Sequence, residues 1–348
     1  MKTFKWCLLL IALSSYGLLS GVTVNSEDSG KNEKSKWRQC LPKTNPGQRW
    51  AHALSYDEAR GRTVLFGGAA DGGPLEQPTK FLNDTWEWDG KDWVDKALQT
   101  KPPARCGHAL VYDSKRKKII LFGGCHNENG YYNDTWEYDG AGWTEKLTEN
   151  KPMARCWQTL AYDSARERVV LFGGVGSQDN KTLIDSLDDT WEYDGENWKQ
   201  LSPRTSPPGR RHHAMTYDLS RKVIVMFGGL RNPNLLQDTW EWDGKDWTLK
   251  KCEVKPPVRE AGGLVYDSHR KKSILFGGVG PGLSLFNDTW EYDGSNWMQY
   301  SGQDRPSARD LMGLTYDSHR CKVVLFGGYA LGASSPRLND TWEYGIDK

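Results

Sequence analysis

The sequence lacks an excess of either charge and has only one long apolar run. Its 348 residues carry 46 basic and 45 acidic side chains, a net charge of +1, with both signs spread along the chain. Such a balance gives no basic stripe for nucleic acid and no acidic tail. The one apolar run, residues 6–19, is too short to span a bilayer comfortably.

Several catalytic signatures are missing as well. The chain has no Gly-x-Ser-x-Gly nucleophile elbow, no phosphate-binding loop, no His-Glu-x-x-His zinc motif and no Asp-box of sialidase propellers. The first three absences argue against a serine hydrolase, a P-loop NTPase and a zinc protease of that type. We therefore favour a binding protein over an enzyme, and we expect no cofactor.

Residues 1–26 have the pattern of a secretory signal peptide. Lys2 and Lys5 precede the apolar run, and small and polar residues follow it. This pattern predicts a secreted chain, extracellular or periplasmic, in which disulfides can form. An uncleaved membrane anchor is the alternative interpretation. Residues 27–36 are predicted to be a disordered polar linker, and residues 37–348 a folded domain without a membrane span.

The rest of the chain contains six copies of one pattern, about fifty residues apart. Each copy has Phe-Gly-Gly after an apolar stretch, then Asp-Thr-Trp-Glu, and in five copies a second tryptophan seven residues after the first. An arginine follows the second tryptophan by twelve residues, and Tyr-Asp follows the arginine by seven. A period of this length is typical of repeat architectures.

The N-terminus completes the sixth copy. The chain ends too soon after Trp342 to supply a second tryptophan, but Trp37 stands in the same register ahead of Arg49 and Tyr56. The last piece of the repeat therefore lies at the N-terminus, and the first three pieces lie at the C-terminus. This arrangement predicts that the two chain ends meet and close a ring.

Each copy is expected to form four β-strands. In the second copy these are residues 107–112, residues 119–122, residues 135–138 and a strand around Trp143. Short β-branched and aromatic stretches are strand signals, and the Asp-Gly pair before Trp143 favours a hairpin turn. We predict an all-β fold, a six-bladed β-propeller of four-stranded blades, because such sheets bury their faces by packing radially on one another. The N-terminal strand is expected to join the C-terminal blade.

The double glycine after an apolar strand, the tryptophan that follows it and the arginine before the next blade resemble kelch repeats over residues 37–344. The resemblance implies a kelch-type propeller, similar in fold to the central domain of galactose oxidase. It does not select a function, because kelch propellers include scaffolds, peptide-binding domains and sugar mutarotases. The propeller of galactose oxidase has seven blades, and we assign none of its copper ligands here.

One segment of the repeat varies in length. Between the double glycine and Asp-Thr-Trp lie 15, 9, 14, 8, 9 and 11 residues in the six copies. In an antiparallel four-stranded blade, this segment and the arginine-containing segment emerge on one face, here called the variable-loop face. Loops on a rigid scaffold often carry binding sites, and the central mouth of a propeller is its natural concavity. We expect function at this mouth.

Six arginines begin the innermost strands and are expected to form a ring near the mouth. In kelch domains that bind acidic peptides, similar arginines contact carboxylates, as their planar donors suit them to do. The favoured interpretation is structural, because every copy also has the Asp and Glu of Asp-Thr-Trp-Glu for a buried ion pair. The ring comprises Arg49, Arg105, Arg155, Arg210, Arg259 and Arg309.

The residues near these arginines differ from copy to copy and are candidate ligand contacts. Aromatic platforms beside a few charged groups suit a sugar or a peptide. The candidate ligand-binding residues are Trp50, His52, His108, Trp157, Arg211, His212, Glu260, Asp310 and Tyr329. Sugar mutarotation needs only an acid and a base across the anomeric centre. The candidate catalytic residues for such a reaction are Arg211, His212, Glu260 and Asp310.

Three cysteines are predicted to lie near the mouth. A hairpin centred on Lys115 and Arg116 places Cys106 almost opposite Cys125, so we predict a cross-strand disulfide between them. Cys156 is a competing partner for Cys125. A metal site formed by Cys106, Cys125 and Cys156 with a histidine is the less favoured alternative.

The sequence thus favours a secreted protein that recognises an extracellular carbohydrate or protein partner through the variable-loop face. The alternative is a mutarotase-like epimerase, acting on a sialic acid or another hexose at the mouth. Nucleic acid is not an expected partner. Among five Asn-x-Thr sequons, Asn180 is the favoured glycosylation candidate, because the other four directly precede the third strand of a blade.

Overall fold

A computed structural model describes residues 35–71, 80–128, 130–178, 183–331 and 336–346. Short antiparallel β-strands dominate these residues, and no α-helix occurs among them, so the predicted all-β class is confirmed. The described part of the chain has no apolar helix of membrane-spanning length. The predicted signal peptide, most of the predicted linker and Asn180 lie outside the described residues.

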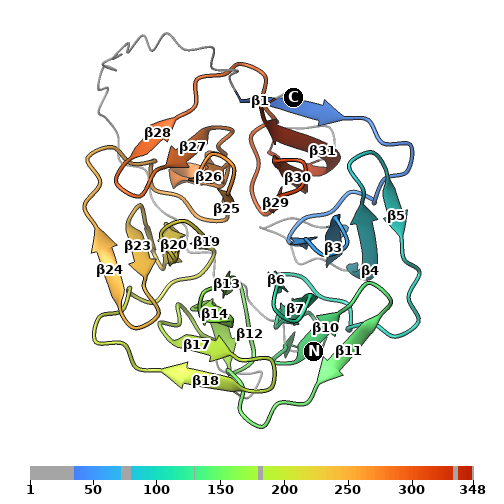
Figure 1. Ribbon diagram of the computed structural model, residues 1–348, viewed down its shortest axis with the longest axis horizontal. Helices are drawn as coiled ribbons and strands as arrows, with labels where there is room; N and C mark the ends of the chain where they lie inside the picture. The colour runs from blue at the N-terminus through green and yellow to red at the C-terminus, as the bar shows by residue number, and fades with distance from the viewer. Residues whose placement is uncertain (1–34, 72–79, 129, 179–182, 332–335, 347–348) are drawn as a thin grey trace.

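Six four-stranded sheets, the blades, surround a central axis (Figure 1). Blade one contains β2 (Ala53–Asp57), β3 (Arg62–Ala69), β4 (Phe81–Trp88) and β5 (Trp93–Asp95). Blade two contains β6 (Ala109–Asp113), β7 (Lys118–Phe122), β10 (Thr135–Tyr138) and β11 (Trp143–Lys146). Blade three contains β13 (Thr159–Asp163), β14 (Arg168–Phe172), β17 (Thr190–Tyr193) and β18 (Trp198–Leu201).

The remaining blades repeat this order. Blade four contains β19 (Ala214–Asp218), β20 (Val223–Phe227), β23 (Thr239–Trp242) and β24 (Trp247–Lys250). Blade five contains β25 (Gly263–Asp267), β26 (Lys272–Phe276), β27 (Thr289–Tyr292) and β28 (Trp297–Gln299). Blade six contains β29 (Gly313–Asp317), β30 (Lys322–Tyr329), β31 (Arg337–Gly345) and β1 (Lys36–Cys40). The first strand of each blade lies nearest the axis and the fourth lies at the periphery (Figure 1).

The N-terminal strand completes the last blade. β1 pairs antiparallel with β31, and Trp37 stands opposite Tyr344. In Figure 1 the blue β1 accordingly lies beside the dark red β31. The strand begins at Lys36, the last residue of the predicted linker.

Short elements occupy the variable segments between second and third strands. In blades one and six, β3 with β4 and β30 with β31 continue as paired strands beyond the double glycine, with a register shift at Phe66/Gly68 and at Phe326/Gly328. The other variable segments contain β8 (Cys125–His126), β9 (Gly130–Tyr131), β15 (Val175–Ser177), β16 (Leu183–Ile184), β21 (Leu230–Arg231), β22 (Asn234–Leu235) and the 3₁₀ turn η1 (Pro281–Leu283). β12 (Arg155–Cys156) pairs with β15.

The hydrophobic core lies between neighbouring blades. The ring centroids of Trp143 in blade two and Phe66 in blade one are 5.2 Å apart, and Trp143 Nε1 donates a 2.9 Å hydrogen bond to Thr85 Oγ1. A buried indole N–H needs such a partner, so this one tryptophan supplies both packing and a specific contact. The six equivalent bonds are Trp37–Thr289, Trp93–Thr341, Trp143–Thr85, Trp198–Thr135, Trp247–Thr190 and Trp297–Thr239.

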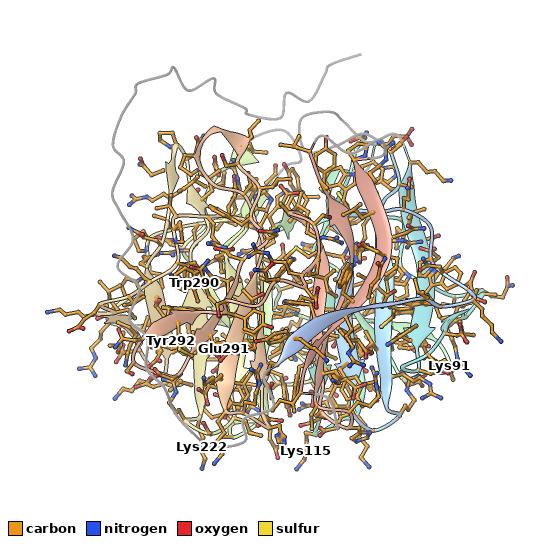
Figure 2. The ribbon with its side chains drawn as sticks, turned by 90° about the horizontal axis from the view of Figure 1, so that it is seen from above. Lys91, Lys115, Lys222, Trp290, Glu291 and Tyr292 are labelled. Atoms are coloured by element: carbon orange, nitrogen blue, oxygen red, sulfur yellow. The ribbon has the colours of Figure 1, made fainter. Side chains whose placement is uncertain are left out.

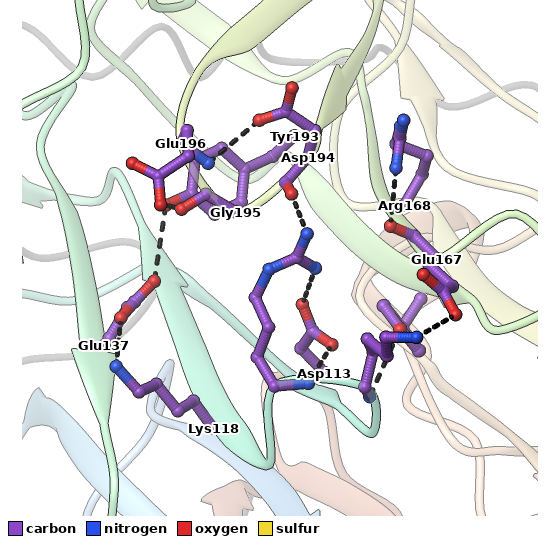
Figure 3. A network of polar contacts seen from close by, with 12 residues as sticks. Asp113, Lys118, Glu137, Glu167, Arg168, Tyr193, Asp194, Gly195 and Glu196 are labelled. Atoms are coloured by element: carbon purple, nitrogen blue, oxygen red, sulfur yellow. Dashed lines mark hydrogen bonds and ion pairs between the residues drawn. The ribbon is translucent and has the colours of Figure 1, made fainter.

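A further set of polar contacts joins neighbouring blades between the middle of the molecule and the face opposite the variable loops, which we call the turn face. Lys115 and Lys222 lie at this end of the molecule, whereas Trp290, Glu291 and Tyr292 lie midway (Figure 2). Between blades two and three, Glu137 accepts hydrogen bonds from Lys118 Nζ at 2.7 Å and from the Tyr193 hydroxyl at 3.4 Å (Figure 3).

An arginine four residues after each Tyr-Asp tyrosine belongs to this turn-face set. Arg60 Nη2 lies 2.7 Å from Asp57 Oδ2, and Arg60 also pairs with Glu87, the last residue of Asp-Thr-Trp-Glu in blade one. The corresponding residues are Arg60, Arg116, Arg166, Arg221, Arg270 and Arg320. Our sequence interpretation did not use these arginines, although their spacing is as regular as that of the first arginine ring.

Candidate functional site

The six ring arginines are framework residues. Arg105 donates from Nη1 to Asp134 Oδ1 at 2.6 Å and from Nη2 to Asp134 Oδ2 at 2.7 Å, and its Nη1 also donates to the Gly123 carbonyl at 3.0 Å. Each ring arginine is buried and forms the same fork with the Asp of its own Asp-Thr-Trp-Glu. These guanidinium groups thus donate their hydrogen bonds to partners within the blade, which is the arrangement that the structural interpretation expects.

A closed ring of six backbone hydrogen bonds lies two residues beyond the arginines. Each member donates its N–H to the carbonyl oxygen of the equivalent residue in the preceding blade, over 2.8–3.1 Å, and the last bond, from Ala51 to Leu311, closes the circle. The members are Ala51, Gly107, Trp157, His212, Ala261 and Leu311. All six have φ between 50° and 63°, a left-handed conformation that is uncommon for the five that are not glycine. We call this circle the hydrogen-bond ring, and it forms the floor of the mouth.

The wall of the mouth is built from six cross-strand pairs. In each blade, the residue before the hydrogen-bond ring pairs with the residue that follows the double glycine. The pairs are Trp50–Ala69, Cys106–Cys125, Cys156–Val175, Arg211–Leu230, Glu260–Val279 and Asp310–Tyr329. Blades one to three thus contribute an apolar half of the mouth, and blades four to six contribute a half that contains three charged residues, here called the polar half.

Contacts run from Trp157 of blade three into the polar half, blades four to six. The ring of His212 lies edge-on to Trp157 with 4.4 Å between ring centroids, and its Nδ1 lies 2.7 Å from Glu260 Oε2. Asp310, in the next blade, is near enough for the charge of Glu260 to affect its ionisation. Arg211 forms an ion pair with Asp185. The structure therefore brings the four candidate catalytic residues together in one half of the mouth.

Asp310 has a strongly altered acidity. Burial, and then the charge of Glu260, raise the pKa of Asp310 to about 8. Its side chain is buried, and Oδ1 has no hydrogen-bond partner among the described residues. A carboxyl group in this state is mostly protonated at neutral pH, so Asp310 is a hydrogen-bond donor beside the acceptor Glu260.

A small hollow lies on the axis at the level of the hydrogen-bond ring. Its volume is about 130 Å³, and it is lined by the six ring members and by the residue that follows each of them. Pockets that enclose drug-sized ligands usually measure roughly 300–1,000 Å³. This hollow can therefore receive a projecting group of a partner but cannot enclose a large ligand.

Several predicted ligand contacts have another place in the structure. Trp50 and Trp157, expected to be aromatic platforms, are only 1% and 8% exposed, because they pack with the cysteines in the apolar half. His52 and His108 are buried with their rings edge-on to Phe326 and Phe66. These four side chains are therefore largely buried in the packing around the mouth.

Tyr329 remains at the mouth. It is partly exposed, and it exchanges backbone hydrogen bonds with Asp310 at 3.0 and 2.9 Å. Of the nine predicted ligand contacts, the five that keep some exposure or line the polar half are Arg211, His212, Glu260, Asp310 and Tyr329.

The three mouth cysteines lie together as thiols. Cys106 stands opposite Cys125 as predicted, and their Sγ atoms are 3.8 Å apart, beyond the roughly 2.05 Å of a disulfide bond. Burial raises the pKa of the Cys156 thiol. The part of the chain that the structure describes contains no cluster of three His, Cys, Asp or Glu side chains arranged for a metal ion. The predicted disulfide stays a prediction.

Two features of the site were not predicted from the sequence. Asp185, the partner of Arg211, lies in a variable segment whose length gives no register, so no spacing identified it. The hydrogen-bond ring is formed by backbone atoms of chemically unrelated residues. The sequence shows one regularity among these residues, which is that each stands two positions after a ring arginine.

Comparison with known proteins identifies similar repeats. A family model described as the KLHDC2/KLHL20/DRC7 Kelch-repeats domain matches residues 92–254 and 140–293, which together are more than half of the chain. Adagio-like protein 2 of Oryza sativa subsp. japonica is 34% identical over 110 residues, 31% of this chain. The matched segment spans 16% of the length of that rice protein. A solved structure of YjhT has a TM-score of 0.64 and 14% identity, covering 86% of this chain and 96% of YjhT, so the two share a fold.

Proposed function

Because the chain belongs to the kelch-repeat family, we propose that it is a secreted interaction protein whose variable-loop face binds an extracellular carbohydrate or protein. The family supports a role in protein interaction. The signal-peptide pattern of residues 1–26 supports an extracellular partner. The polar half of the mouth is the part of this face that selects the partner.

One contrast between framework and mouth carries the proposal. The ring arginine, the Asp-Thr-Trp-Glu segment and the blade tryptophan recur in the blades and bond to one another. The first residue of the mouth wall, in contrast, is Trp, Cys, Cys, Arg, Glu or Asp at one geometric position. A position that varies on a constant scaffold is free to serve a ligand.

The polar half determines what the partner must present. Glu260 offers an acceptor, protonated Asp310 offers a donor, and His212 links Glu260 to the neighbouring blade. Hydroxyl and amide groups, which both donate and accept, match this set. The hollow of about 130 Å³ admits one such group while the rest of the partner stays on the rim.

Binding assays on a glycan array and a peptide display library test the proposal. The protein is compared with a Glu260→Gln, Asp310→Asn double variant and with Lys91→Ala, an exposed substitution away from the mouth. We expect at least one class of ligand to bind the protein and Lys91→Ala, and to lose at least tenfold in affinity with the double variant. Absence of binding in both assays would count against the proposal.

Sugar mutarotation is a second candidate, favoured by one observation. Asp310 holds a proton at neutral pH, and His212 Nε2, buried in the same half of the mouth, has no partner among the described residues. When Nδ1–H of the neutral imidazole donates its hydrogen bond to Glu260, Nε2 carries the lone pair, so acid and base lie in one site. NMR exchange between the anomers of N-acetylneuraminic acid and of hexoses tests this idea. Equal exchange rates with and without the protein would remove it.

A further inference from the structure

Three buried thiols form a distinct cluster in the apolar half of the mouth. Cys106, Cys125 and Cys156 are 0%, 6% and 1% exposed, and they pack against Trp50 and Trp157. The acid–base contacts of the polar half do not involve them. A free cysteine usually packs as a small apolar side chain, but three thiols in one cluster can also react with one another.

The backbone places two of these thiols as direct cross-strand partners. Cys106 N–H donates to the Cys125 carbonyl at 3.1 Å, and Cys125 N–H donates to the Cys106 carbonyl at 2.9 Å. Antiparallel residues bonded in this way have Cα atoms about 5.5 Å apart, which is within the range that disulfides prefer. The Sγ atoms, 3.8 Å apart, can approach bonding distance by rotation about the side-chain bonds.

Cys156 differs from the other two in its own pairing. Its cross-strand partner in blade three is Val175, so it has no thiol opposite it. It reaches Cys125 only across the boundary between blades, by an S–H contact. Cys125 therefore contacts two thiols. Cys106 is its cross-strand partner within blade two, and Cys156 belongs to blade three.

We propose that Cys106 and Cys125 are a reversible redox pair, which a small peroxide converts to a disulfide while Cys156 stays a thiol. The Cys125 thiolate attacks hydrogen peroxide to give a sulfenic acid and hydroxide. The Cys106 thiol then attacks the sulfenic sulfur, which forms the S–S bond and releases water. Two thiols are oxidised and one peroxide is reduced to two waters in total.

Position and surroundings select Cys125 as the attacking sulfur. It is the most exposed of the three thiols, and S–H donation from Cys106 and Cys156 lowers the pKa of Cys125. Its neighbour His126 packs against Phe81 of blade one, with 4.4 Å between ring centroids. A bond at Cys125 would therefore fix the start of the variable segment of blade two, next to blade one.

Peptide mapping of the full chain tests the assignment. Fully reduced protein is treated with hydrogen peroxide, quenched with iodoacetamide under denaturing conditions and digested without reductant. We expect a peptide linked between Cys106 and Cys125, with Cys156 alkylated, and we expect dithiothreitol to reverse the link. Cys40, Cys252 and Cys321 are partly exposed in other parts of the fold and serve as internal controls that stay alkylated. A Cys125–Cys156 link, alkylation of every cysteine, or sulfinic acid at Cys125 without a link would each overturn the proposal.

Two substitutions test whether cross-strand register decides which thiols become linked. Val175→Cys adds a thiol opposite Cys156, in the position that Cys125 occupies in blade two. We expect peroxide to link Cys156 to the introduced thiol in addition to the first link. Val279→Cys is the matched control, because Glu260 stands opposite it, and its added thiol is expected to stay alkylated. Equal cross-linking of both introduced thiols would overturn the argument from register.

Discussion

The indole Nε1 of Trp37 donates a 2.9 Å hydrogen bond to Thr289 Oγ1, although 252 positions separate these residues. Trp93 makes the same 2.9 Å bond to Thr341 and so joins blade one to blade six. Together with the pairing of β1 and β31, these bonds join the N-terminal strand and blade six to the other blades in one ring. The N-terminal strand therefore contributes to the core of the domain.

Trp37→Phe is expected to destabilise the protein by about 1–2 kcal/mol, because the aromatic packing remains while the buried Thr289 hydroxyl loses its donor. Urea unfolding followed by tryptophan fluorescence measures the change. Gln39→Ala, an exposed position on the same strand, is the control and is expected to change little. Equal midpoints for the two variants would show that the closing bond contributes nothing.

Arg259→Gln is expected to cost roughly 3–5 kcal/mol, because it leaves the Asp288 carboxylate buried without its charged partner. The side chains of Arg259 and Asp288 are 1% and 11% exposed. Arg204→Gln breaks the ion pair with Asp246 at a site where the arginine is 79% exposed, and its urea midpoint is expected to stay unchanged. Similar midpoints for both variants would contradict a structural role for the ring arginines.

His108→Gln is expected to make the protein less sensitive to acid. Burial and the nearby Arg105 lower the pKa of His108 from 6.5 to about 3, so its contribution to stability is complete above pH 6.5 and is lost as the pH falls towards 3. Glutamine already fills the equivalent place in blade three, where Gln158 Nε2 donates to the Phe122 carbonyl at 2.9 Å.

Urea unfolding from pH 7.5 to pH 4 measures the effect of His108→Gln. Below pH 6 the free energy of unfolding of the variant is expected to fall less steeply with pH than that of the parent. The two slopes are expected to differ by about 1.4 kcal/mol per pH unit, the value for one proton. Parallel curves for variant and parent would mean that His108 is protonated within the folded protein.

In Asp310→Asn, the free energy of unfolding is expected to fall less between pH 4 and pH 8 than it does in the parent protein. Because the folded-state pKa of about 8 exceeds the ordinary value of 3.8, the contribution of Asp310 is complete below pH 3.8 and is lost as the pH rises to about 8. Urea midpoints at pH 4, 6 and 8 measure the difference from the parent. Glu260→Gln is the companion variant, since it removes the neighbouring charge and leaves the burial. An unchanged pH profile in Asp310→Asn would show that Asp310 ionises normally.

The blades could be predicted from the sequence because their spacing is invariant. Trp37, Arg49 and Tyr56 repeat the intervals of the other copies, so strand order and chain closure follow from counting. The opposition of Cys106 and Cys125 follows for the same reason, because a hairpin of known length sets the register. Intervals of this kind depend on backbone geometry alone.

Burial at the mouth could not be predicted by counting. Trp50 and Trp157 occupy the expected positions, but they pack with Cys125 and Val175, which lie in variable segments that have no common length. Asp185 meets Arg211 through the fold of such a segment. His212 is a member of the hydrogen-bond ring, and His52 directly follows a member of it in another blade. Of the two, His212 contacts a carboxylate, because Glu260 stands in the blade that follows it.

Titration calorimetry tests the central claim most directly, namely that the polar half of the mouth selects the partner. The first ligand found by array or display is titrated into the protein, into the Glu260→Gln, Asp310→Asn variant and into a Lys91→Ala, Lys115→Ala variant altered away from the mouth. The account predicts equal affinity for the protein and the Lys91→Ala, Lys115→Ala variant, and at least a tenfold loss for the mouth variant. Equal affinity for all three proteins would contradict it.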